Sequence, residues 1–255
     1  MRIEELLVRI DYAGSLAPDE NTLASLQDCF NYRIPFENLD IHMGIRLVLD
    51  LDVIWNKIVH RQRGGWCYEL NETFLYLLQS LGYSAYRAHA EVLGSDHGDP
   101  YSHQVSIVTL SEDWFVDVGF GTTFSSPLLL NTEKPQSCRT GVFRVLQRQG
   151  VYLIEREEEG GWQPLLRFAA AECRRMQFES RCHWLQTSPQ SHFTRKRLCS
   201  MLTPKGRWTL SGNRLLFDGE ERELVAESDY LGVLEETFGI SLATAAWVDP
   251  IEDFR

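Results

Sequence analysis

The sequence lacks any long apolar run. No stretch of its 255 residues approaches the roughly 18 to 20 uncharged apolar residues that a bilayer crossing needs. The amino terminus, where an export signal would stand, interrupts its apolar residues with Glu4, Glu5, Arg9 and Asp11. We therefore expect a cytoplasmic protein with no membrane partner.

Paired cysteines are also missing. The six cysteines are scattered without a C-x-x-C spacing, unlike those of disulfide-stapled secreted domains and zinc fingers. A zinc site made of Cys67, His89, His97 and His103 is disfavoured, because their spacing fits no ligand pattern and a metal would occupy the thiol. We expect reduced thiols and no metal.

The 25 positively charged side chains of lysine and arginine are outnumbered by 36 of aspartate and glutamate. The net charge of −11 argues against nucleic acid as a partner, because phosphate binding needs a basic surface that releases counterions. Residues 192–207 are the exception, and this segment would suit a phosphate-bearing cofactor or would form a solvated charged strand face. Its basic residues are Arg195, Lys196, Arg197, Lys205 and Arg207.

The first third of the chain has the apolar spacing of helices that pack one face inward. Helices are predicted over residues 2–12, 20–31, 51–61 and 67–81, the last ending at Gly82. With 44% apolar residues the chain can bury a substantial core, and it contains no internal repeat.

From Ser84 the pattern changes to short β-rich runs, which places a domain boundary near residue 84. Ser188-Pro189 reads as a linker, so a second boundary falls near residue 190. A final helix is expected over about 228–238, closed by Gly239. Strands are predicted over 84–93, 102–110, 113–118, 142–147, 151–156, 195–202, 206–211 and 214–217, and a short helix over 176–186.

Cys67 has the position of a nucleophile. It follows Gly64-Gly65-Trp66 and begins a strongly patterned helix, where free N–H groups and the helix dipole stabilise a thiolate and lower the thiol pKa. Backbone N–H groups around it are candidate oxyanion donors. The alternative is a buried cysteine that fills space.

His103 and Asp117 are candidate partners for that thiol. Only Ser111 and Glu112 separate the strands over 102–110 and 113–118, so a hairpin would bring the two side chains together. A buried aspartate needs a hydrogen-bond donor, and an imidazole N–H supplies one while it fixes the ring tautomer. Asp117 could instead cap the Gly119-x-Gly121 turn.

These segments resemble the arylamine N-acetyltransferases of the bacterial type. RGGWCYELN (63–71), the strand opened by His103 and DVGFG (117–121) are similar to the three signature segments of that family, in the same order. Further similar segments are IPFENLD (34–40), SPQSHF (188–193) and FGISL (238–242). The similarity covers nearly the whole chain.

The resemblance implies an α+β fold in three domains with a core like that of papain-like cysteine proteases. The domains would be a helical bundle over 1–84, a β-barrel over 85–190 and an α/β lid over 191–255. Cys67 would be the nucleophile, His103 the base and Asp117 the orienting acid. Acetyl-coenzyme A would be a co-substrate, with no permanently bound cofactor, and an aromatic amine or hydrazine would take the acetyl group from Cys67.

The resemblance also assigns binding residues. Phe36, Phe120 and Phe193 would line the amine pocket, although each could be an ordinary core phenylalanine. Ser102 and Thr203 would contact coenzyme A. Two features depart from the family pattern, since Trp66 is bulky for its position in the motif and the chain ends early, at Arg255, which would leave the acyl pocket more open.

Other functions use the same order of residues. A papain-like or transglutaminase-like cysteine hydrolase would accept a peptide carbonyl without coenzyme A. An amide synthase that closes a macrolactam on a carrier-bound chain is closer in kind. A binding protein that keeps the fold without catalysis would not need all three of Cys67, His103 and Asp117.

Overall fold

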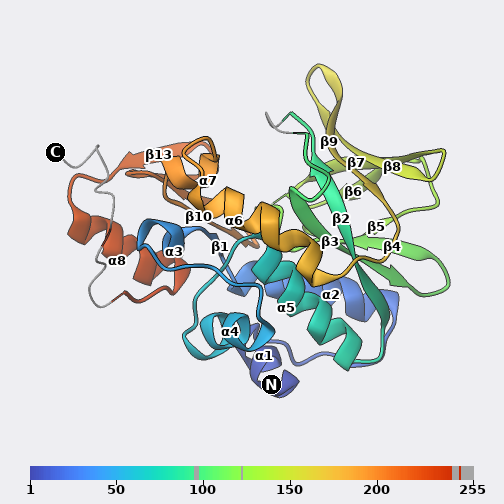
Figure 1. The fold of residues 1–255 in the computed structure, drawn as a ribbon, viewed down its shortest axis with the longest axis horizontal. Helices are drawn as coiled ribbons and strands as arrows, with labels where there is room; N and C mark the ends of the chain where they lie inside the picture. Colours follow the sequence, from blue (N-terminus) through green and yellow to red (C-terminus); the bar gives the residue numbers. More distant parts are fainter. Residues whose placement is uncertain (95–97, 122, 243–246, 248–255) are drawn as a thin grey trace.

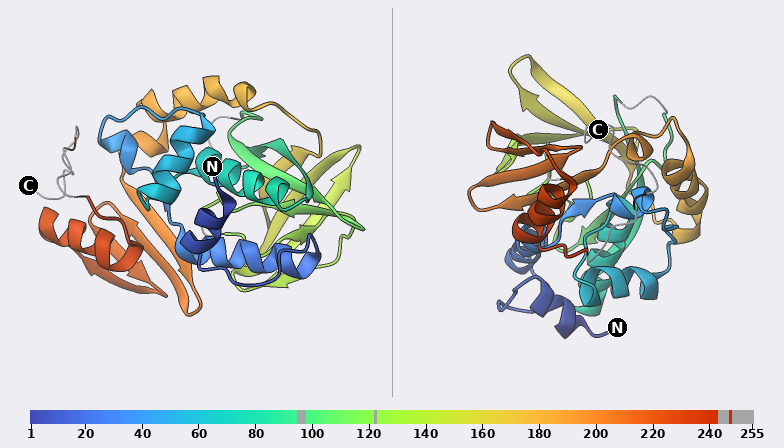
Figure 2. Two further views of the ribbon diagram at one scale, coloured as in Figure 1. Left: turned by 90° about the horizontal axis from the view of Figure 1, so that it is seen from below. Right: turned by 90° about the vertical axis from the view of Figure 1, so that its left-hand side faces the viewer.

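The chain folds into a group of helices and two antiparallel sheets. The computed structural model describes residues 1–94, 98–121, 123–242 and 247. In Figure 1 the helices of the first third lie in the centre and lower part, the larger sheet on the right and the smaller sheet on the left. Seen from below, the smaller sheet and the last helix lie at the end of the molecule opposite the larger sheet (Figure 2). This is the α+β architecture that the resemblance implies.

The predicted helices of the first third are present, most with different ends. The segment predicted as one helix over 51–61 changes to a π-helical turn at Asn56, so this prediction was wrong in detail. Residues 45–50 form neither a helix nor a strand, and no helix was predicted there. The elements are α1 (Ile3–Arg9), α2 (Glu20–Arg33), α3 (Leu39–His42), α4 (Leu51–Trp55), η1 (Asn56–His60) and α5 (Cys67–Ser80).

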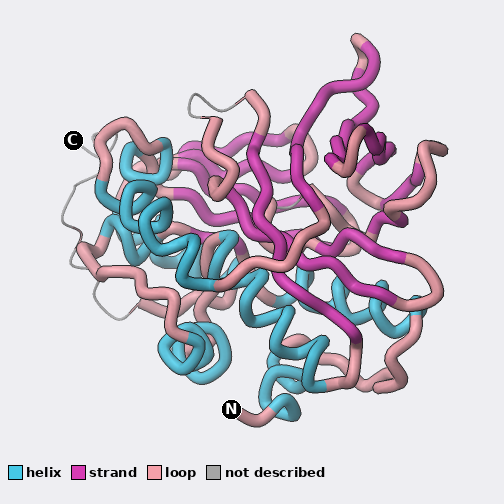
Figure 3. The backbone as a smooth tube through the Cα atoms, turned by 45° about the vertical axis from the view of Figure 1, so that its right-hand side comes forward, coloured by secondary structure: helices cyan, strands magenta, loops and turns pink. Residues whose placement is uncertain are grey.

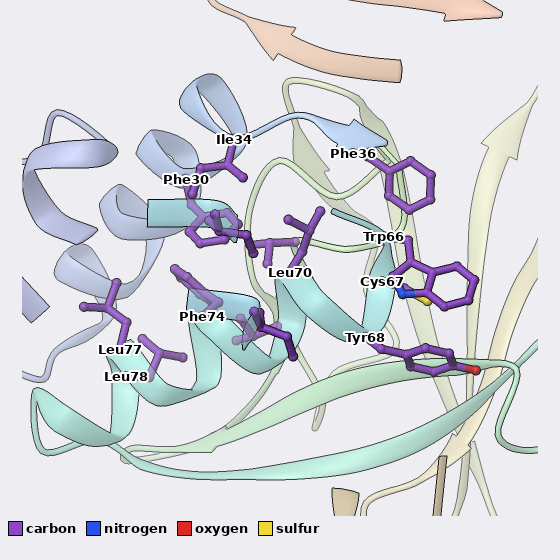
Figure 4. Packing of buried hydrophobic residues seen from close by; sticks show 14 of the residues in the cluster. Phe30, Ile34, Phe36, Trp66, Cys67, Tyr68, Leu70, Phe74, Leu77 and Leu78 are labelled. Carbon is purple, nitrogen blue, oxygen red and sulfur yellow. The ribbon is translucent and has the colours of Figure 1, made fainter. Parts of the chain in front are cut away.

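Helix α5 is the centre of the helical part. Its apolar face, which includes Leu70, Phe74, Leu77 and Leu78, is buried in the core of the helical part, where Phe74 meets Phe30 of α2 edge to face at 5.1 Å (Figure 4). Burial of each such side chain stabilises the fold by about 1.5–3 kcal/mol. The helix stops before Gly82, which has φ +89° as predicted for a left-handed terminator. Cys67 therefore stands at the start of a firmly anchored helix.

Within the described part of the chain, β2 to β9 form an eight-stranded antiparallel sheet that curves into a barrel. Its edge strands are joined by Gln136, whose side-chain amide hydrogen-bonds both the N–H and the C=O of Leu129 at 2.8 and 2.9 Å. Figure 3 shows the helices gathered on one side of the strands. The strands are β2 (Ser84–Val92), β3 (His103–Thr109), β4 (Asp113–Val116), β5 (Leu128–Leu129), β6 (Gln136–Cys138), β7 (Gly141–Arg148), β8 (Val151–Glu158) and β9 (Gly161–Ala169).

The strand order holds one surprise. The predicted hairpins β3–β4 and β7–β8 are present, the latter with Gln149 and Gly150 both at positive φ in the turn. Strand β9 was not predicted, yet it pairs with β2 on one side and β8 on the other and so joins the two halves of the sheet. Its Pro164 lies opposite Glu155, at a register shift in β8.

The smaller sheet has the order β1-β10-β11-β12-β13. Its edge strand β1 comes from the first third of the chain and pairs Phe36 with Ser200. The strand predicted over 195–202 begins later, because residues 192–195 form a short helix whose N-cap is Ser191. Three short helices connect the two sheets, and α8 covers the smaller one. The strands of the smaller sheet are β1 (Phe36–Glu37), β10 (Leu198–Thr203), β11 (Gly206–Ser211), β12 (Arg214–Phe217) and β13 (Glu220–Glu223). The helices are η2 (Arg175–Phe178), α6 (Glu179–Thr187), α7 (His192–Arg195) and α8 (Glu227–Phe238).

Helix α8 ends at Gly239 with φ +67°, as predicted.

In the residues that the structure describes, no helix has both the length and the apolarity needed to cross a membrane. The six cysteines are all free thiols, and the described residues contain no group of three or more potential metal ligands. His97 and the carboxyl-terminal segment that ends at Arg255 lie outside the described residues.

Candidate active site

Two glycines allow the loop before Cys67 to press against the chain at Pro35. A Cβ atom on Gly64 would lie 2.0 Å from the carbonyl oxygen of Pro35, so no larger residue fits there. The N–H of Gly65 donates to that same oxygen at 3.2 Å. The loop is thereby fixed, and Cys67 follows it as the first residue of α5, with 3% of its surface exposed.

His103 and Asp117 are hydrogen-bonded, as predicted. The Nε2 atom of His103 lies 2.7 Å from Oδ2 of Asp117, and both side chains are buried. The other carboxylate oxygen accepts hydrogen bonds from the N–H of Gly119 and from the amide of Asn71, each at 2.8 Å. Because Nε2 is bonded to Asp117, Nδ1 is the ring nitrogen that remains to exchange a proton with the Cys67 sulfur.

Asn71 joins helix α5, which begins at Cys67, to the barrel, and sequence reasoning missed this role. Its amide nitrogen also donates to the carbonyl of Gln104 at 2.6 Å, and its amide oxygen accepts from the N–H of Val118 at 3.0 Å. The available signal was its spacing, since Asn71 follows Cys67 by four residues and so lies on the same helix face. One side chain therefore contacts strand β3, which begins at His103, and the segment after β4 that contains Asp117.

A cavity of about 290 Å³ brings most of the predicted site residues together. Cys67 and His103 both line it, together with the three predicted phenylalanines and Ser102. The complete lining is Phe36, Cys67, Val92, Ser102, His103, Gly119, Phe120, Gly121, Arg181, Leu185, His192, Phe193 and Leu198.

The aromatic walls of this cavity are in mutual contact. The rings of Phe36 and Phe193 lie 6.2 Å apart, and Phe120 meets the imidazole of His103 edge to face at 5.1 Å. Trp66 is fully buried beside Phe193, at 5.3 Å, and next to Tyr68 (Figure 4). It does not line the cavity itself, but it packs against Phe193, which does.

The prediction that the helix start lowers the pKa of the Cys67 thiol was wrong in its net direction. Burial and the negative charge of Asp117 raise this pKa well above its ordinary value, and the hydrogen bond from the N–H of Tyr68 lowers it by less. In this buried site, and without a neighbouring positive charge, the Cys67 thiol would therefore stay protonated at neutral pH. The thiolate needs an adjacent cation, and protonated His103 is the group that can supply it.

A cluster of buried charged side chains fixes the start of α5 on the side of the helical part. Lys57 donates to both carboxylate oxygens of Glu69 at 2.9 Å, and one of these oxygens also accepts the N–H of Trp66 at 3.2 Å. Lys57 further pairs with Asp40 at 2.9 Å, and Asp40 pairs with Arg63 at 3.0 Å. Burial alone would lower the pKa of Lys57, but the surrounding carboxylates outweigh it and raise that pKa. These ions were not predicted as a cluster.

Thr203 lies apart from Cys67, in a second cavity of about 460 Å³. Of the basic residues predicted in segment 192–207, Arg207 lines this cavity, whereas Arg197 is buried and paired with Glu227 at 3.1 Å. The lining consists of Arg139, Thr140, Arg156, Leu202, Thr203, Gly206, Arg207, Thr209, Leu216, Asp218 and Gly219.

Comparisons with known proteins agree on one family. The profile of a family described as N-acetyltransferase matches residues 19–248. The chain is 31% identical to the pineal gland isozyme NAT-10 of arylamine N-acetyltransferase from Gallus gallus, over 95% of this chain and 95% of that protein. It is also 31% identical to the arylamine N-acetyltransferase of Mycolicibacterium smegmatis, over 95% of this chain and 93% of that protein. The structure of Mycobacterium marinum arylamine N-acetyltransferase in complex with CoA superposes with a TM-score of 0.87 at 28% identity, over 94% of this chain and 93% of that one.

Proposed function

This chain belongs to the arylamine N-acetyltransferase family, and we propose that it uses Cys67, His103 and Asp117 to move an acetyl group from acetyl-coenzyme A to an aromatic amine. The observation that carries the proposal is the buried His103–Asp117 hydrogen bond of 2.7 Å beside the cavity that Cys67 lines. A thiol, a base and an orienting carboxylate are the parts that covalent acyl transfer requires.

In the first step the Cys67 proton passes to Nδ1 of His103, and Asp117 stabilises the imidazolium. The sulfur then attacks the thioester carbonyl carbon of acetyl-coenzyme A. The carbon–sulfur bond to coenzyme A breaks, and the departing sulfur takes the proton from His103. The acetyl group remains on Cys67 as a thioester, and coenzyme A leaves.

In the second step the amine nitrogen attacks that thioester. His103 accepts the proton that the nitrogen loses, the bond between carbon and the Cys67 sulfur breaks, and the amide leaves. The proton is then shared again between His103 and the thiol. The aromatic ring of the amine would lie among Phe36, Phe120 and Phe193, whose faces and edges suit stacking.

The second cavity suits the phosphates of the donor. Its walls carry Arg139, Arg156 and Arg207. A guanidinium group can donate two parallel hydrogen bonds to two oxygens of one phosphate. Strand β10 connects the two cavities, since Leu198 lines the first and Thr203 the second. The five residue-to-residue steps from Leu198 to Thr203 span roughly 17 Å, a length that an extended pantetheine arm can follow.

Substitution of the arginine at 156 tests this placement. The variant Arg156→Gln should raise KM for acetyl-coenzyme A about tenfold and leave transfer from S-acetylpantetheine, which lacks the nucleotide, within about twofold. Equal losses with both donors would show that Arg156 acts on the fold and not on the phosphates.

The acetyl-enzyme itself tests the mechanism. Incubation with acetyl-coenzyme A alone should add one acetyl mass to the peptide that contains Cys67, and Cys67→Ala should abolish both this gain and transfer while keeping the fold. Full turnover by that variant would exclude the covalent route. Hydrolysis of peptides without coenzyme A would instead favour a cysteine hydrolase, which the family match does not support.

We further propose that the protein acts in the cytoplasm, where acetyl-coenzyme A is available. Its six free cysteines suit a reducing compartment.

A further inference from the structure

Arg181 is a buried cation in the wall of the active-site cavity that the proposed mechanism does not use. It lies on α6 and lines the cavity together with Cys67 and His103. Only 10% of its side-chain surface is exposed, and its Nε atom is buried with no hydrogen-bond partner in the described residues. A buried donor without a partner costs about 1–3 kcal/mol, so a ligand that accepts from it would recover this energy.

The guanidinium is held in a fixed orientation. It stacks on the ring of Trp184 at 4.2 Å, which leaves its N–H edges free of the aromatic face. The carboxylate of Asp99 lies 3.6 Å from Nε, too far for a hydrogen bond, and its other oxygen accepts from the N–H of Tyr101 at 2.8 Å. Asp99 therefore balances part of the charge without occupying the donors.

The size of the cavity restricts the ligand. About 290 Å³ holds one substituted ring beside Cys67. The phosphates of acetyl-coenzyme A cannot be the partner, because the pantetheine arm separates them from a thioester that reaches the sulfur. An anionic group that contacts Arg181 must therefore belong to the acceptor and lie on or next to its ring.

We propose that Arg181 determines acceptor specificity by binding a carboxylate on the aromatic amine. This inference rests on the proposed function. A planar carboxylate matches the fork of the guanidinium, and the apolar walls formed by Phe36, Phe193 and Leu185 strengthen such a pair by excluding water. The amino group at the other end of the ring then faces the thioester on Cys67.

The test compares 4-aminobenzoate with 4-aminobenzamide, which has the same shape without the charge. In Arg181→Met the ratio of kcat/KM for the acid to kcat/KM for the amide should fall about 10- to 100-fold, as expected for loss of a charged hydrogen-bonded pair. Arg181→Lys should retain part of the ratio. Asp99→Asn should raise it, because a competing negative charge is removed. Arg174→Met, at an exposed position outside the cavity, is the matched control and should leave the ratio as in the wild type.

The half-reaction with acetyl-coenzyme A separates the outcomes. If the wild type forms acetyl-enzyme and Arg181→Met changes transfer to both acceptors equally, the inference is overturned while the proposed function stands. Slower acetyl-enzyme formation in Arg181→Met with an unchanged acceptor ratio would assign the arginine to the donor and also overturn it. Failure of the wild type to form acetyl-enzyme would defeat the proposed function itself.

Discussion

Gly119 is the position where one added methyl group should disable the site. It lies in the DVGFG segment, directly against the start of α5. A Cβ atom there would lie 2.7 Å from the Cα and 2.9 Å from the carbonyl oxygen of Cys67, and 2.6 Å from the amide nitrogen of Asn71. Its φ is not in the left-handed region, so Gly119→Ala adds steric conflict without backbone strain.

The expected magnitude follows from what must move. The Cys67 contacts are to backbone atoms at the start of a buried helix, so the loop has to withdraw. Withdrawal loosens the 2.8 Å bond from the Gly119 N–H to Asp117 and shifts His103 relative to the sulfur. A misplacement of about 1 Å can cost about 100-fold in rate. Overpacking should destabilise the fold by about 1–3 kcal/mol, or about 2–12 °C in Tm.

The assay is the rate of coenzyme A release in the first turnover, measured with Tm on the same sample. Gly232→Ala on α8 is the control, because a Cβ there meets nothing within 4 Å and should leave both quantities unchanged or raise Tm slightly. A Gly119→Ala enzyme that acylates at the wild-type rate would refute the claim that this contact positions the nucleophile.

Three other substitutions test the site. Asn71→Leu should lower kcat about 10- to 100-fold with little change in KM for acetyl-coenzyme A, since it removes a donor to Asp117; steady-state kinetics that show only a KM effect would contradict this. In His103→Gln the pKa of the Cys67 thiol should remain above its ordinary value of 9.0. Alkylation of this variant by iodoacetamide should therefore be slow at pH 7 and rise as the pH passes 9, whereas the wild type should react near neutrality. Identical pH profiles of the two proteins would count against a pair formed by Cys67 and His103. Lys57→Met should cost about 3–5 kcal/mol of stability, or about 6–20 °C in Tm, because it leaves buried carboxylates without their cation, and an unchanged melting curve would show that the cluster contributes nothing.

The arrangement of the three proposed catalytic residues was predictable because each has a local signal. A helix that begins after two glycines locates Cys67, and a two-residue connection sets β3 against β4 so that His103 faces Asp117. The turn at Gln149-Gly150 and the stop at Gly82 are equally local. Such features depend on a few neighbouring residues, so the sequence determines them before the rest of the chain is placed.

What the sequence did not reveal depends on distant partners. Strand β9 contains Pro164, which disfavours a strand interior, but pairing on both sides and a register shift in β8 accommodate it. Strand β13 (Glu220–Glu223) is an exposed edge made of four charged residues and has no apolar alternation to detect. The role proposed for Arg181 depends on α6 lying against the cavity, which sequence spacing cannot show.

The raised pKa of the Cys67 thiol explains why its surroundings are so strongly constrained. A helix start that lowered the pKa enough by itself would tolerate a loosely placed base. Here the thiolate depends on His103, so the sulfur and the imidazole must be placed accurately before the substrate arrives. Glu69 holds the start of α5 from the helical side, and Asn71 ties the same helix to the carboxylate of Asp117 from the barrel side. Two residues of one helix, Glu69 and Asn71, thus fix the positions of the proposed nucleophile and of its proposed base. These buried polar residues therefore maintain the geometry of the site and not the acidity of the thiol.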